Sequence, residues 1–166
     1  MFMDEARFGR ISDSRECWAP HGVRPLIPSQ IVREFVYAYA AVCPFDGGLD
    51  ALVLPEVNTE SMSLFLAELS DNHQDENIVL IMDKAGWHTA KNLIVPRNIT
   101  LHWLPPYSPE LNPVEHLWDE VREKWFQNRY FQSLDAVEDQ LVDALAFLMR
   151  YPELVKSMTL FNWMNN

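Results

Sequence analysis

Residues 104–118 read Leu-Pro-Pro-Tyr-Ser-Pro-Glu-Leu-Asn-Pro-Val-Glu-His-Leu-Trp. The three prolines before Asn112 exclude regular structure, because proline lacks a backbone N–H and disfavours a helical conformation in the residue before it. Asn112-Pro113 then marks the start of a helix, since Asn is a good N-cap and Pro suits the first helical position. This start places Glu115 in the first turn of the helix.

Two more carboxylates follow short apolar runs. Asp83 closes the run 78–82, and Asp4 closes the run 1–3. We expect two strands that end at these acids to lie side by side and parallel, with both carboxylates at the carboxyl edge of a sheet, where ligands bind in α/β proteins. Acids placed this close repel each other unless a cation lies between them, so together with Glu115 they predict an all-oxygen site for Mg²⁺ or Mn²⁺.

The remaining pattern predicts an α/β fold with a mixed sheet flanked by helices. Thr59 is expected to cap a helix that runs to about Leu69, and Ser133 another that runs to about Met149. The other expected elements are a strand at 35–43, a turn at 44–48, a strand at 49–54, strands at 78–82 and 99–104, and a short helix at 89–93. We assign residues 1–166 to one domain, because no repeat, linker or low-complexity segment divides them.

Three helices are expected to bury an apolar stripe, because their large apolar residues recur at helical spacing. The stripes are Met62, Phe65, Leu66 and Leu69; then Val114, Leu117, Trp118, Val121 and Trp125; and then Val137, Leu141, Ala144, Leu145 and Leu148.

Composition limits the possible environments and partners. The chain has no apolar run long enough to span a bilayer and no signal-peptide pattern, so we expect a cytoplasmic protein. Cys17 and Cys43 form neither a metal-ligand spacing nor a disulfide framework. The net charge of −11 argues against strong DNA binding by the chain alone, although five of its thirteen basic residues lie in the first 33 positions.

Each acid also has a structural explanation, and spacing alone leaves both explanations open. Asn112 and Glu115 fit a capping box, in which the Glu115 side chain reaches back to a backbone N–H. Asp83 fits a residue that caps the turn after its strand. Asp4 beside Glu5 fits a solvated surface pair.

Three blocks of the chain resemble the acidic blocks of the bacterial insertion-sequence transposases of the mariner superfamily, the DDE transposases. The blocks are residues 4–8, 82–88 and 104–118, and the third is highly specific. The resemblance implies a ribonuclease H-like core in which Asp4, Asp83 and Glu115 are catalytic and hold two Mg²⁺ (or Mn²⁺) ions. Such cores cut transposon ends and join the freed 3′-hydroxyls to target DNA, typically at TA.

The resemblance also implies partners and supporting residues. We expect DNA as the partner, a homodimer when active, and a separate helix-turn-helix part, because only three residues precede Asp4. A first strand this short is expected to fray. The helix between Asp83 and Glu115 is also expected to be short. Residues expected to support the acids or contact DNA are Glu5, Lys84, Trp87, His88 and Asn112; Lys84 replaces an Asn frequent in the family.

Two other functions stay open at this stage. One is a catalytically inactive remnant or interaction module of a split transposase. The other is an ordinary ribonuclease H-like nuclease.

Overall fold

A five-stranded mixed sheet forms the centre of the molecule. The computed structural model describes residues 1–12 and 15–165. The strands are β1 (Phe2–Ile11), β2 (Ile31–Cys43), β3 (Gly48–Leu54), β4 (Ile78–Met82) and β5 (Ile99–Trp103), in the spatial order β3-β2-β1-β4-β5. The pairs β1–β2 and β2–β3 are antiparallel, whereas β1–β4 and β4–β5 are parallel. The predicted mixed sheet and the parallel pairing of the strands before the two aspartates are therefore confirmed.

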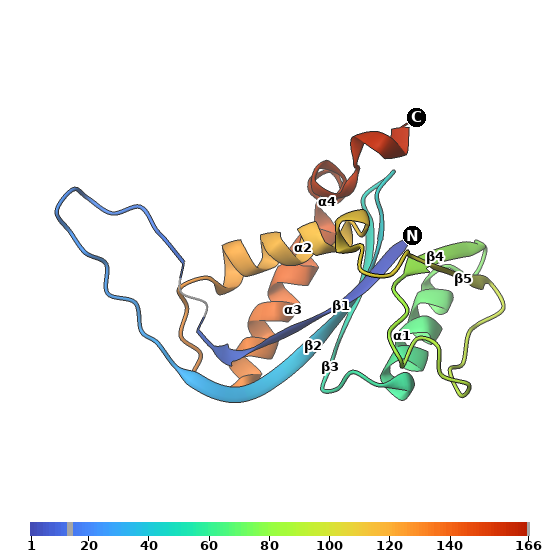
Figure 1. The fold of residues 1–166 in the computed structure, drawn as a ribbon, viewed down its shortest axis with the longest axis horizontal. Helices are drawn as coiled ribbons and strands as arrows, with labels where there is room; N and C mark the ends of the chain where they lie inside the picture. Colours follow the sequence, from blue (N-terminus) through green and yellow to red (C-terminus); the bar gives the residue numbers. More distant parts are fainter. Residues whose placement is uncertain (13–14, 166) are drawn as a thin grey trace.

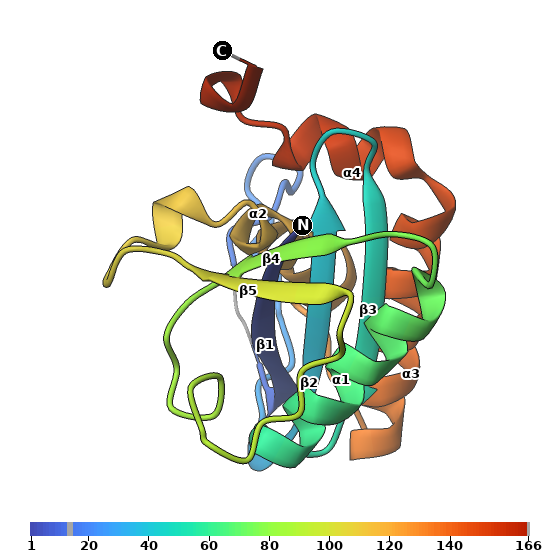
Figure 2. The same cartoon turned by 90° about the vertical axis from the view of Figure 1, so that its right-hand side faces the viewer.

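Helices cover both faces of the sheet (Figures 1 and 2). The helix α1 (Thr59–Asn72) packs on one face, and its four predicted apolar residues are buried there. The helices α2 (Val114–Val121), α3 (Leu134–Arg150) and α4 (Pro152–Thr159) cover the other face. The predicted stripes of α2 and α3 are buried in that second core, apart from Trp125, which is only partly buried.

The helix starts agree with the sequence at one cap and differ at two. The helix α2 begins at Val114 and its N-cap is Pro113, one residue later than the predicted Asn112. The Ser133 hydroxyl accepts the backbone N–H of Ala136 at 3.1 Å, as the sequence predicts for the cap of α3. The helix α1 is instead capped by Asn58, whose side-chain oxygen accepts the N–H of Ser61 at 2.8 Å. Thr59 already has helical conformation, so the expected cap was placed one residue late.

The first strand is much longer than the sequence suggested. β1 spans ten residues and pairs with β2 from Phe2 opposite Val42 to Ile11 opposite Ile31. Buried and less buried residues alternate along the strand, and Phe2, Ala6 and Phe8 are buried on one face. This alternation was not recognised in the sequence because the strand contains many polar residues. The prediction that the strand ends at Asp4 is therefore wrong, and the short strand on which the expected fraying was based is replaced by one of ten residues.

The connections hold two further corrections. Residues 83–98 contain turns but no helix, so the short helix expected at 89–93 is wrong. The proline-rich loop includes one 3-10 turn, Pro109–Leu111, and α2 continues into a π-helical turn, Arg122–Phe126. In that turn the N–H of Gln127 donates to the carbonyl of Arg122 at 2.8 Å.

The segment 15–30 between β1 and β2 has no regular structure and projects from the body as an arm (Figure 1). Trp18 and Leu26 of this arm are almost fully exposed. In the part of the chain that the structure describes, no helix is both long and apolar enough to cross a lipid bilayer.

We expect Gly47→Ala to destabilise the protein by about 1–3 kcal/mol or more, because a non-glycine residue in the left-handed region costs about this much. Gly47 has a φ of +78°, and a Cβ atom there would collide with the backbone carbonyl of Pro152 at the start of α4. The matched control is Gly22→Ala, at a φ of +81° with open space around it. Urea denaturation measures both; an equal loss of stability would contradict the role of the contact with α4.

Candidate active site

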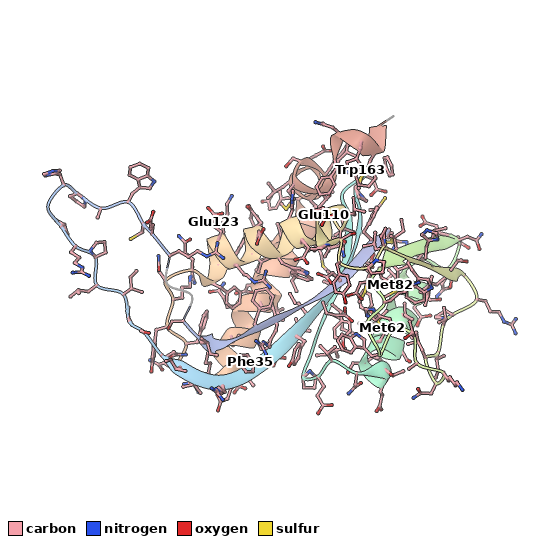
Figure 3. The ribbon with its side chains drawn as sticks, in the orientation of Figure 1. Phe35, Met62, Met82, Glu110, Glu123 and Trp163 are labelled. Atoms are coloured by element: carbon pink, nitrogen blue, oxygen red, sulfur yellow. The ribbon has the colours of Figure 1, made fainter. Side chains whose placement is uncertain are left out.

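The structure brings Asp4, Asp83 and Glu115 to one cavity of about 440 Å³. Asp4 comes from β1, Asp83 follows β4 directly, and Glu115 lies in the first turn of α2. Figure 3 labels Met82 and Glu110, which mark the end of β4 and the 3-10 turn before α2. Lys84, Asn112 and the proline-rich loop complete the lining.

The cavity lies where the sheet opens. β1 pairs with β4 only at Phe2 opposite Ile81, and β4 and β5 then run steeply across β1 (Figure 2). The carbonyl of Met3 accepts a hydrogen bond from the side-chain amide of Asn112 at 3.1 Å instead of one from β4. Asn112 is buried, and its Oδ1 accepts the N–H of Val114 at 3.3 Å. This residue therefore ties the start of α2 to the central strand.

The carboxylate of Asp4 lies on the face of β1 that α2 covers. The indole N–H of Trp118 donates to its Oδ2 at 3.0 Å. Burial, followed by the negative charges of Glu115 and Glu5, raises the pKa of Asp4 to about 7, although the Trp118 hydrogen bond opposes the shift. The solvated surface pair considered for Asp4 and Glu5 is therefore wrong.

Glu115 does not form the capping box that its spacing allowed. The N–H of Asn112 donates to the carbonyl of Pro109 at 2.8 Å, and the Glu115 carboxylate forms no hydrogen bond with the described residues. Burial raises the pKa of Glu115; Asp119 and Asp83 add to the rise, and Arg122 opposes it. The carboxylate thus remains open to the cavity.

Asp83 both caps its turn and contacts a buried histidine. Its Oδ1 accepts the N–H of Ala85 at 2.9 Å and lies 2.8 Å from Nδ1 of His88, while its side chain is 60% exposed. The other ring nitrogen of His88 lies 2.8 Å from Oε1 of Glu5, which also accepts the indole N–H of Trp87 at 2.9 Å. Trp87 and His88, which the sequence predicted to support the acids or contact DNA, thus both contact the Glu5 carboxylate.

The pKa of His88 reflects these two carboxylates. Burial lowers it, but the hydrogen bond and charge of Glu5 and the charge of Asp83 outweigh burial, so the pKa is raised above its ordinary value. A doubly protonated ring donates to both acids at once. His88 therefore fixes the position of the Asp83 carboxylate through one ring nitrogen, and Glu5 fixes the position of His88 through the other.

The donor set fits a hard divalent cation. Asp4, Asp83 and Glu115 offer only oxygen ligands, and the raised pKa values of Asp4 and Glu115 show partly buried carboxyl groups that a cation would stabilise in their charged form. Among the residues that the structure describes, no three His, Cys, Asp or Glu side chains are already grouped as a metal site.

Two features of the site gave no signal in the sequence. Trp118 was expected only as part of an apolar stripe, because periodicity says nothing about its indole N–H. Tyr107, which also lines the cavity, has a φ of +58° although it is not glycine. Backbone strain of this kind is frequent at functional sites, but sequence does not reveal it.

The chain is similar to known proteins over most of its length. The family of DDE superfamily endonucleases matches residues 1–138. An uncharacterized protein of Sinorhizobium fredii (strain NBRC 101917 / NGR234), y4pE/y4sA, is 43% identical over 130 residues, which is 78% of this chain and 96% of that protein.

Among solved structures, the Mos1 transposase paired-end complex with the left transposon end superposes with a TM-score of 0.64 at 18% identity, over 94% of this chain and 52% of that one. The Mos1 mariner paired-end complexes with Mn and with Mg give TM-scores of 0.65 and 0.57, both at 17% identity over 95% of this chain and 52% of theirs. The chain thus spans about half the length of these transposases. The likeness shows their ribonuclease H-like catalytic fold.

We expect Asn112→Ala to destabilise the protein by about 1–3 kcal/mol, because the buried carbonyl of Met3 loses its donor. Asn72→Ala is the control, since it removes an exposed amide that donates to Asp50 at 2.9 Å and should change stability by less than about 0.5 kcal/mol. Equilibrium denaturation measures both variants. Equal effects would show that the bond between α2 and β1 contributes no more than an exposed one.

The pKa of Asp4 predicts how stability depends on pH. Because its folded pKa of about 7 lies above the ordinary value of 3.8, the stabilising contribution of Asp4 is fully present below about pH 4 and is lost as the pH rises to about 7. In buffer with EDTA, we expect Asp4→Asn to gain about 2–4 kcal/mol relative to wild type between pH 4 and pH 8. The control Asp75→Asn, at an exposed site, should show no such gain; parallel curves for wild type and Asp4→Asn would refute the prediction.

Proposed function

The chain belongs to the DDE superfamily endonucleases, and we propose that it is the catalytic part of a DNA transposase. In this proposal it cuts DNA strands at transposon ends and joins them to target DNA. One observation carries the proposal: three carboxylates from three separate elements line one cavity at the opening of the sheet. We treat residues 1–166 as a single catalytic domain.

We assign the metal ligands to Asp4, Asp83 and Glu115. Divalent ions, Mg²⁺ or Mn²⁺, would activate a water or a 3′-hydroxyl and stabilise the leaving oxygen of a phosphodiester. The protein positions the ligands: Asn112 fixes the start of α2, Trp118 orients Asp4, and His88 holds Asp83. Asp4 would give up a proton as a cation binds, because its pKa of about 7 leaves it partly protonated near neutral pH.

Lys84 supports the assignment of DNA as substrate. It lines the cavity, is exposed, and has no ion pair with any described residue. A free ammonium group beside the acids attracts a phosphate of the bound strand. The Asn frequent at this place in related enzymes lacks such a charge, so Lys84 would strengthen contact with the DNA backbone here.

DNA recognition and assembly are proposed from the same relatives. The Mos1 complexes contain paired transposon ends. Because the chain spans about half of the Mos1 chain, we propose that specific recognition of the ends comes from a helix-turn-helix part outside the matched half, and that the active form is a dimer.

We expect Asp83→Asn to lower metal-dependent nicking of supercoiled plasmid at least about a hundredfold, because a bound metal supplies several kcal/mol of transition-state stabilisation. Wild type should nick DNA with Mn²⁺ or Mg²⁺ and not with EDTA. Asp139→Asn, the same chemical change on the exposed side of α3, is the control and should keep wild-type activity. Unchanged nicking in Asp83→Asn would refute the metal assignment, and no nicking by wild type would favour an inactive interaction module.

A further inference from the structure

Four arginines line a second, smaller pocket at the far half of β1. The pocket has a volume of about 130 Å³ and lies between β1, the π-helical turn and the base of the arm. Its arginines are Arg7, Arg10, Arg122 and Arg129. In a chain with a net charge of −11 and only thirteen basic residues, this is a marked local concentration of positive charge.

One of the four has a structural role. Arg10 forms an ion pair with Glu34 at 2.7 Å and donates to the carbonyls of Phe131 at 3.1 Å and Gln132 at 2.8 Å. Its donors are therefore engaged within the protein. It joins β1 to the segment before α3 and shapes the wall of the pocket.

The other three have no carboxylate partner, although the Arg129 guanidinium donates a hydrogen bond to Oε1 of Gln140. Among the described residues, Arg7, Arg122 and Arg129 form no ion pair with a carboxylate. Arg7 lies over the ring of Phe35 at 4.4 Å, and Arg122 lies over the ring of Phe8 at 5.6 Å. These aromatic contacts orient the guanidinium groups without neutralising them.

A further polar residue, Gln30, also lines the pocket. The side-chain Oε1 of Gln30 is buried and has no hydrogen-bond partner. Buried polar atoms are nearly always satisfied by protein, water or a ligand.

The arginine pocket and the acid cavity are neighbours along the open edge of β1. Arg7 also lines a cavity with Asp4, Glu5 and Asp83. Arg122 follows Glu115 by seven residues, about two turns along α2 and into its π-helical continuation, so both lie on one side of this helix. A chain of phosphates that passes the carboxylates therefore meets these arginines next.

We propose that the arginine pocket binds a backbone phosphate of the DNA strand whose neighbouring phosphates lie at the acid cavity. The inference rests on the proposed function. Arginine is suited to this task, because its planar guanidinium pairs with two phosphate oxygens at once. The volume also agrees, since sites for drug-sized molecules occupy about 300–1,000 Å³ and this pocket is large enough only for a smaller group.

The test is DNA binding in EDTA, measured by fluorescence anisotropy with a labelled duplex of arbitrary sequence at several salt concentrations. In the triple variant Arg7→Gln, Arg122→Gln and Arg129→Gln, we expect affinity at low salt to fall at least about tenfold. The slope of log affinity against log salt should become shallower by about 0.9 for each phosphate that the variant no longer neutralises. A matched triple variant, Lys91→Gln, Arg97→Gln and Arg150→Gln, changes the net charge equally at exposed sites outside the pocket and should bind within about twofold of wild type.

Three results would overturn the inference. The first is no DNA binding by wild type at low salt, and the second is an equal loss of DNA affinity in the two triple variants. The third is that inorganic phosphate raises the Tm of wild type while the pocket variant binds DNA as tightly as wild type does. The last result would assign the pocket to a free oxyanion. Thermal melts establish that both triple variants are folded. The failure of the proposed function would look different, because binding in EDTA requires no catalysis: weaker binding by the pocket variant without any nicking by wild type would keep the pocket and reject the transposase.

Discussion

The site depends on one hydrogen bond at the place where two parallel strands part. β1 and β4 pair at Phe2 and Ile81, and directly afterwards the carbonyl of Met3 takes its hydrogen bond from the side chain of Asn112. A buried carbonyl without a partner would be costly, so the amide stabilises the opening of the sheet. The same amide fixes where α2 begins. The position of Glu115 relative to Asp4 and Asp83 follows from it.

The side chains of β1 alternate between the two faces of the sheet, and this alternation decides where its charged groups lie. Asp4 shares a face of β1 with Phe2, Ala6 and Phe8, and it meets Trp118 beneath α2. Glu5 is buried on the opposite side, where Trp87 and His88 contact it. Because successive side chains point to opposite faces, two adjacent acids have two different environments. The first part of β1 thus carries acids, and its far part carries arginines.

The electrostatics of the site oppose folding and favour ligand binding. Asp4 and Glu115 are partly buried, and neighbouring acids raise their pKa values, so ionising them costs free energy. His88 compensates two other acids of the site, because it contacts Glu5 and Asp83 together. Groups with such perturbed pKa values are frequent at active sites, where stability is given up for chemistry. The neighbouring arginines have the opposite charge, which suits a polyanion lying across both pockets.

Local sequence determined much of this protein: the strand before Asp83, the hairpin of β2 and β3, the apolar stripes of α2 and α3, the Ser133 cap, and the position of Glu115 in the first turn of its helix. These features depend on neighbouring residues, through hydrophobic period, proline geometry and capping. Only the tertiary structure decided the length of β1. Its sequence is too polar to be recognised as a strand, and its ten residues are held in the sheet by pairing with β2. The tertiary structure also decided the contacts of Asn112 with Met3, Trp118 with Asp4, and His88 with Glu5, and the gathering of four arginines. Those contacts join residues that are distant in sequence, and no local pattern encodes which buried polar group meets which.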